Sequence, residues 1–158
     1  MNQIQQIVAY FCIHYPYATE LSNARMTKLV YLADWFSALA DNTTLTEINW
    51  VFNHYGPYVD DVINNVSLNP HFSIIRTQTN FGSPKSVVSY FGQDITEHLP
   101  VRTRQILDLV INKTQDLYFN DFINYVYSTY PVRAQDRYAN LNLVALAQEY
   151  RNLPMNNN

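Results

Sequence analysis

The stretch from Ser22 to Asp41 constrains the fold more than any other part of the chain, because apolar residues occupy two sides of its helical pattern. Ser22 is a favoured N-cap residue, so a helix is expected to begin directly after it. One apolar stripe of this helix contains Met26, Leu29, Val30, Ala33, Ser37 and Ala40, and a second contains Leu32, Trp35, Phe36 and Leu39. A helix that is apolar on two sides has to be covered on both, which predicts a central helix surrounded by other elements.

Five further segments repeat apolar residues with the 3.6-residue period of an amphipathic helix. They span residues 4–15, 57–66, 100–111, 120–130 and 140–151. Proline sets three of the expected boundaries, because it lacks the N–H that an interior turn needs. We predict that Pro16 ends the first of these helices, that Pro57 begins the second, and that Pro131 ends the fourth.

Between residues 72 and 91 the pattern changes from a helical period to an alternating one. Residues 72–77 and 87–90 are rich in β-branched and aromatic side chains, and the segment between them carries a glycine and a proline. This arrangement predicts a β-hairpin.

These segments together predict a mainly α (α+β) protein, a compact helical domain of about six helices with one small antiparallel β-hairpin. A chain of 158 residues is expected to form one domain, which we place at residues 1–152. The polar residues 153–158 are expected to fray.

The charge of the chain argues against two classes of partner. A net charge of -3 gives no general attraction to phosphate backbones or anionic lipids, so nucleic acid is not expected as the main partner. No run of about 18 apolar residues occurs, and residues 1–6 form no signal segment. The lone cysteine, Cys12, is expected to be a small buried hydrophobe, which suits a reducing compartment. We therefore expect a cytoplasmic protein with no membrane segment.

The residues that usually build catalytic and metal sites are scattered in this chain. The four histidines are His14, His54, His71 and His98, and no two have the spacing that places a pair of ligands on one helical face. Three glycines, Gly56, Gly82 and Gly92, are too dispersed for a phosphate loop or a nucleophile elbow. We therefore predict a protein that is not an enzyme and that binds neither a metal nor a cofactor.

Tyrosine is abundant, with thirteen residues, and phenylalanine adds eight. Tyrosine combines a broad apolar ring with a hydroxyl group and few rotatable bonds, which favours it at binding surfaces. One interpretation is that some of these tyrosines form a protein-binding surface. The alternative is that most of them are half-buried packing residues.

Lys28 is unusual because it lies inside the most apolar predicted helix. An unpaired buried ammonium group is costly, so the side chain has to reach water or find a partner. We expect Lys28 to pair with Asp60 or Asp61, or to bind carbonyl groups of the Tyr55-Gly56-Pro57 turn. An exposed position at the edge of the helix is the alternative.

Two motifs, which follow one another along the chain, resemble those of a known family. The segment Met26-Thr27-Lys28-Leu29-Val30-Tyr31-Leu32-Ala33 resembles the Leu-x-Lys-Leu-Leu-Tyr-x-Ala helix of the Panacea domain, found in SocA-like antitoxins and phage-associated proteins. Tyr55-Gly56-Pro57-Tyr58 resembles the Tyr-Gly-Pro turn of that family. The likeness spans most of the chain from Ser22 to Tyr150.

The resemblance implies an antitoxin module that neutralises a toxin by direct protein contact, with no further domain attached in this chain. The residues expected to form the shared surface or to support it come from the two motifs and the position before the first. They are Arg25, Lys28, Tyr31, Tyr55, Gly56, Pro57 and Tyr58.

Two other function classes remain open from the sequence. Three helices followed by a two-stranded hairpin is also the element order of a winged-helix nucleic-acid binder, in which Arg76 and Lys85 would lie on the wing. The acidic balance of the chain argues against this alternative. An enzyme is the third class, because scattered residues can meet in a fold.

Overall fold

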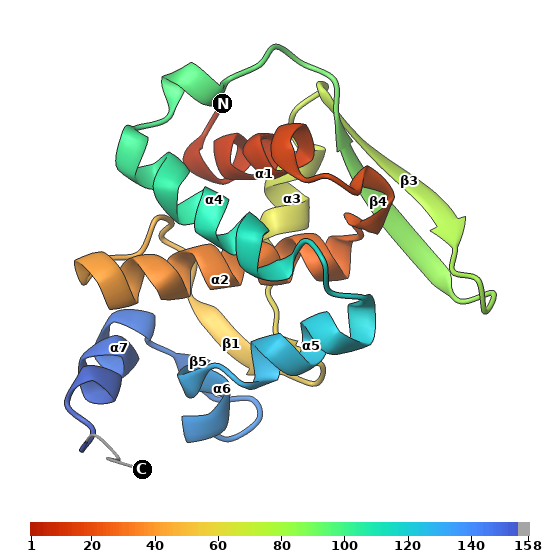
Figure 1. The fold of residues 1–158 in the computed structure, drawn as a ribbon. Helices are drawn as coiled ribbons and strands as arrows, with labels where there is room; N and C mark the ends of the chain where they lie inside the picture. The colour runs from red at the N-terminus through yellow and green to blue at the C-terminus, as the bar shows by residue number, and fades with distance from the viewer. Residues whose placement is uncertain (155–158) are drawn as a thin grey trace.

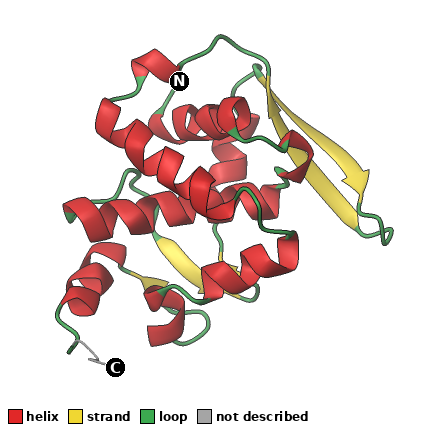
Figure 2. Ribbon diagram, in the orientation of Figure 1, coloured by secondary structure: helices red, strands yellow, loops and turns green. Residues whose placement is uncertain are grey.

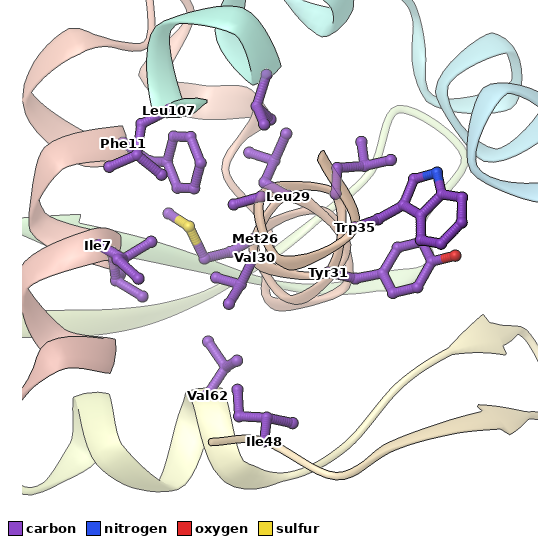
Figure 3. Close-up of a cluster of buried hydrophobic side chains, with 14 of the residues drawn as sticks. Ile7, Phe11, Met26, Leu29, Val30, Tyr31, Trp35, Ile48, Val62 and Leu107 are labelled. Atoms are coloured by element: carbon purple, nitrogen blue, oxygen red, sulfur yellow. The ribbon is translucent and has the colours of Figure 1, made fainter. Parts of the chain in front are cut away.

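The computed structural model describes residues 1–154, and its centre is the helix α2 (Asn23–Asp41). The Ser22 hydroxyl accepts a hydrogen bond from the Arg25 backbone N–H, as expected for an N-cap, and Asn42 ends the helix in a left-handed conformation. The side chains of residues 29–33 are all fully buried. Figure 3 views α2 nearly end-on and shows Met26 and Val30 pointing to one side of the helix and Tyr31 and Trp35 to the other. The prediction of a central helix is confirmed.

Three helices cover one side of α2. They are α1 (Gln3–His14), α3 (Asp61–Ser67) and α4 (Val101–Thr114). They meet over a buried cluster that includes Ile7, Phe11, Met26, Val62 and Leu107 (Figure 3). The cluster accounts for the amphipathic patterns of these segments, because each helix contributes its apolar side to one shared core.

A small sheet and three helices cover the opposite side of α2 (Figure 1). The antiparallel sheet has the order β2-β1-β5, and its elements are β1 (Trp50–Asn53), β2 (Gly56–Pro57) and β5 (Asn140–Leu141). The helices are α5 (Phe119–Tyr127), α6 (Tyr130–Ala134) and α7 (Leu143–Arg151). At the end of α7 the Arg151 guanidinium donates to the carbonyl groups of Ala38 and Leu39, so the last helix closes the C-terminal end of α2.

The predicted hairpin is present and stands at one side of the helices, as the long yellow strands of Figure 2 show. Its strands are β3 (Phe72–Gln78) and β4 (Pro84–Tyr90), which pair from Phe72 opposite Tyr90 to Gln78 opposite Pro84. Two short 3-10 helices complete the described elements, η1 (Ala18–Glu20) and η2 (Thr96–His98).

The expectation of a mainly α fold with a small antiparallel hairpin is confirmed, with three corrections. Pro57 does not begin a helix: it lies in β2, opposite Phe52, and α3 begins only at Asp61. Pro131 does not end a helix either, because it lies in the first turn of the short helix α6, where a missing N–H costs nothing. The segment 140–151 begins as the strand β5, and Asn142 caps the helix α7 that follows.

Residues 1–154 therefore contain seven α-helices, against the expected six or so. Of the tail predicted to fray, residues 155–158 lie outside the described residues. Within the described part, no helix combines the length and the apolar character needed to cross a bilayer.

Candidate functional site

The β1–β2 turn presents an exposed aromatic side chain on a tightly held backbone. Asn53 and Gly56 are partners at the ends of the turn, and the Asn53 side chain accepts a hydrogen bond from the His54 N–H at 2.8 Å. Gly56 has φ +98, which allows the chain to reverse direction within two residues. Tyr55 lies at the tip with 76% of its surface exposed, and its ring packs edge-on against the His54 ring.

The loop before β5 places a second exposed tyrosine beside this turn. The Tyr138 backbone N–H donates to the Phe52 carbonyl, and the Phe52 N–H donates to the Ala139 carbonyl at 2.9 Å. The Tyr138 hydroxyl lies 3.4 Å from His54 Nδ1, and the residue is 65% exposed. The Arg137 guanidinium lies 5.6 Å from the centre of the Phe52 ring. We call His54, Tyr55, Arg137 and Tyr138 the tyrosine surface.

Lys28 lies directly beneath this turn. It is 2% exposed, and its Cε lies 3.6 Å from the position that a Cβ on Gly56 would take. The Tyr58 ring centre is 6.0 Å from its Nζ. Burial lowers the pKa of Lys28 to about 8.

The predicted partners of Lys28 are not found. Among residues 1–154 its ammonium group makes neither an ion pair nor a hydrogen bond, so the expected pairing with Asp60 or Asp61 is wrong. The alternative of an exposed edge lysine is also wrong, because the side chain is buried. Lys28 does lie beside the turn, but it makes none of the predicted bonds to the carbonyl groups of the turn.

Tyr58 ties the turn to the start of α2. Its hydroxyl accepts a hydrogen bond from Asn23 Nδ2 at 3.1 Å, and Asn23 Oδ1 accepts one from the Thr27 hydroxyl at the same distance. Burial raises the pKa of Tyr58, with a smaller contribution from the negative charge of Asp60. The turn is therefore anchored to α2 by polar contacts as well as by packing.

Two of the predicted site residues lie in the interior and away from the turn. Arg25 is fully buried and donates to the Tyr15 hydroxyl and to the carbonyl groups of Thr114 and Leu117, at 2.8–2.9 Å. Tyr31 is also fully buried, and its hydroxyl lies 2.8 Å from Thr129 Oγ1. These two side chains support the fold, while Lys28, Tyr55, Gly56, Pro57 and Tyr58 meet at the turn.

Some residues of the tyrosine surface could not be found from the two motifs. Arg137 and Tyr138 come from a loop more than 80 residues after the turn, and only the pairing of β1 with β5 brings them there.

Asp34 is a buried acidic residue that belongs to neither motif. It accepts hydrogen bonds from the Leu45 and Thr46 backbone, the Thr46 hydroxyl and Trp50 Nε1. An acidic residue in the middle of the most apolar helix was the available signal.

A pocket of about 560 Å³ lies between residues 44–50 and residues 140–144. Glu47 is the one acidic or basic residue in its lining, so the pocket brings together no acid–base pair. Within residues 1–154, no group of three or more His, Cys, Asp or Glu side chains is arranged to hold a metal ion.

The comparisons with known proteins identify a family. The model described as "Antitoxin SocA-like, Panacea domain" matches residues 26–131. Neither the curated proteins nor the solved structures gave a match. The matched part begins in α2, includes the Tyr-Gly-Pro turn and the hairpin, and ends at Pro131 in α6. Since this is more than half of the 158 residues, the chain belongs to the SocA-like antitoxin family, as a Panacea domain protein.

Proposed function

We propose that this protein is an antitoxin-type module that neutralises a cognate toxin by direct contact through the tyrosine surface. One observation carries the proposal: Tyr55 and Tyr138, which are 76% and 65% exposed, both contact His54 at one end of a short sheet, in a member of an antitoxin family. Exposed aromatic residues gathered beside an arginine are typical of the few side chains that dominate a protein interface.

The support beneath the surface favours tight binding. Gly56, Pro57 and Lys28 are buried, and Tyr58 is held by Asn23, so the turn loses little conformational freedom when a partner binds. A surface that is ordered before binding keeps more of its contact energy as affinity.

Growth rescue tests the proposal. The product of the adjacent open reading frame is expected to stop growth when expressed alone, and co-expression of this protein is expected to restore growth. The double variant Tyr55→Ala, Tyr138→Ala should lose the rescue, because each anchor contributes ~2 kcal/mol, or about a 30-fold change in Kd.

Tyr118→Ala is the matched control, since Tyr118 is 81% exposed but caps α5 and does not belong to the tyrosine surface. It should rescue like the wild type. A neighbouring product that is harmless alone, or a double variant that rescues fully, would contradict the proposal.

Neutralisation by direct contact predicts that each toxin molecule needs its own molecule of this protein. We propose that neutralisation needs no cofactor and no catalytic step, so the purified toxin should lose its activity fully only when this protein reaches equal amounts. Full rescue at one molecule per hundred toxin molecules would indicate an enzyme. We place this activity in the cytoplasm, where a reduced lone thiol such as Cys12 is expected.

A further inference from the structure

The register of the β3–β4 hairpin determines which backbone groups of each strand point outward, away from the partner strand. The Phe91 N–H donates to the His71 carbonyl, and the Thr79 N–H donates to the Ser83 carbonyl, at the two ends of the ladder. Hydrogen-bonded and non-hydrogen-bonded pairs alternate in an antiparallel ladder. The odd-numbered residues of β3 therefore bond to β4, and the backbone groups of the even-numbered residues point away from it.

The outer edge of β4 is closed by the rest of the molecule. The Val88 N–H donates to the Leu21 carbonyl at 2.8 Å, and the Cys12 thiol lies 3.9 Å from the Val88 carbonyl oxygen. Pro84 at the start of β4 has no N–H to offer. This edge has little capacity for another strand.

The outer edge of β3 is open. Within the described residues, the backbone N–H and C=O groups of Ile74, Arg76 and Gln78 have no hydrogen-bond partner. Phe72 differs, because its N–H donates to the Asn69 carbonyl. Residues 75–78 are exposed, and β3 contains no proline that would block pairing.

The charge of the hairpin indicates which kind of molecule can bind at the open edge of β3. Residues 72–90 contain Arg76 and Lys85 and no acidic residue, although the whole chain has a net charge of -3. Both basic residues line one shallow pocket of about 190 Å³. A second copy of the hairpin would bring positive charge against positive charge. A phosphate backbone would offer acceptors alone and would leave the strand carbonyl groups unpaired.

We propose that β3 accepts an extended, acidic segment of the cognate toxin as a third strand, with a carboxylate of that segment near Arg76. Alternating donors and acceptors recognise a peptide backbone, and Arg76 with Lys85 supplies the preference for acidic side chains. The inference rests on the proposed function and adds a second contact to the tyrosine surface.

Amide hydrogen exchange of this protein, alone and with the neighbouring toxin, tests the strand addition. In the free protein the amides of Ser73, Ile75 and Thr77 should exchange slowly, and those of Ile74, Arg76 and Gln78 should exchange fast. Binding should slow the exchange of these even-numbered amides by at least about tenfold, because each gains a ladder hydrogen bond.

Two variants separate the backbone from the charge. Gln78→Pro removes an outward N–H and leaves the bonds to β4 intact, and Arg76→Glu reverses the charge. Each should weaken toxin binding by about 10-fold, as expected for one lost hydrogen bond or one reversed pair. Lys113→Glu is the control for charge, because Lys113 is exposed on α4. An unchanged melting temperature of each variant shows that it folds.

The outcomes distinguish the two proposals. A toxin that binds and is neutralised while Ile74, Arg76 and Gln78 stay unprotected overturns the strand addition and leaves the proposed function standing. A neighbouring product that does not bind overturns both. Protection of the same amides at high concentration of this protein alone, or with duplex DNA alone, also overturns the inference, in favour of a second copy or of nucleic acid.

Discussion

At the scale of single residues, Arg25 shows how a charge can be held in the interior of this protein. Its guanidinium lies 4.4 Å from the centre of the Phe122 ring and donates to the carbonyl group of Thr114, the last residue of α4, and to that of Leu117 in the turn that follows. The last carbonyl groups of a helix carry partial negative charge and lack partners within the helix. Arg25 therefore joins the first turn of α2 to the end of α4.

Replacing Arg25 by methionine tests this role. Arg25→Met leaves the Leu117 carbonyl without a donor and removes one hydrogen bond each from the Thr114 carbonyl and the Tyr15 hydroxyl, so we expect a loss of ~3 kcal/mol in the free energy of unfolding. Urea titration measures the change. Arg133→Met, at an exposed position, is the control and should change stability by under about 0.5 kcal/mol. Equal effects of the two variants would contradict the assignment.

Lys28 makes stability depend on pH. Its pKa is about 8 in the folded protein and 10.5 ordinarily, so between these values the unfolded chain binds more protons. Stability therefore rises with pH from about 8 towards 10.5, and the protein bears the full cost of the buried charge below pH 8. One pKa unit corresponds to about 1.4 kcal/mol.

Urea titrations of the wild type and Lys28→Met, from pH 7 to pH 9.5, measure this dependence. The methionine variant should be the more stable at pH 7, and the difference between the two should shrink as the pH rises. Groups that titrate in both proteins cancel in that difference. Parallel profiles would show that Lys28 is not buried as an unpaired amine.

At the scale of elements, Gly56 and Gly82 form a matched pair. Both have positive φ, but a Cβ on Gly56 would lie 3.2 Å from the Tyr127 ring, whereas one on Gly82 would meet nothing within 4 Å. Gly82→Ala should cost ~1 kcal/mol from backbone strain.

Gly56→Ala should cost ~1 kcal/mol more, because the Tyr127 ring must move, and it should also weaken toxin binding. Thermal unfolding and the binding titration provide the two measurements. Equal costs at the two positions would mean that Tyr127 does not press against the turn.

The elements that could be predicted from the sequence are those defined by local signals. The two apolar stripes and the Ser22 cap predicted the start of α2 and its approximate end, and the alternating pattern with its loop predicted the hairpin. The sheet β2-β1-β5 could not be predicted, because Trp50 pairs with Leu141 across about 90 residues of chain. Pro57 and Pro131 show a related limit: proline is tolerated in an edge strand as well as in the first turn of a helix, and only the surroundings decide between them.

In the candidate site, too, only the residues marked by local signals could be predicted. The turn that carries Tyr55 was found, because glycine and proline mark turns locally. Its neighbour Tyr138 was not, since a contact made through tertiary structure leaves no trace in either segment. Arg25 and Tyr31 were correctly linked to the motif helix, but their full burial could not be read from a pattern that also suits a half-exposed helix.

At the scale of the whole molecule, α2 contributes to both sides of the core, with α1, α3 and α4 on one side and α7 on the other (Figure 1). Neither side retains a complete core without α2, so we propose that residues 1–152 unfold as one unit. Fluorescence of the buried Trp35 and Trp50, and hydrogen exchange of the α1 amides, should give the same free energy of unfolding in urea. An α1 that opens at lower free energy than the tryptophan transition would contradict this.

The bonds from Arg151 to the end of α2 have a consequence for how the protein is made. A ribosome that has synthesised the hairpin and α4 has also finished α2, yet the guanidinium that closes the end of that helix has still to be joined to the chain. The nascent protein therefore reaches its final shape only near the end of translation. A message cut short before the codon for residue 151 would yield a chain whose longest helix lacks these two bonds at its C-terminal end.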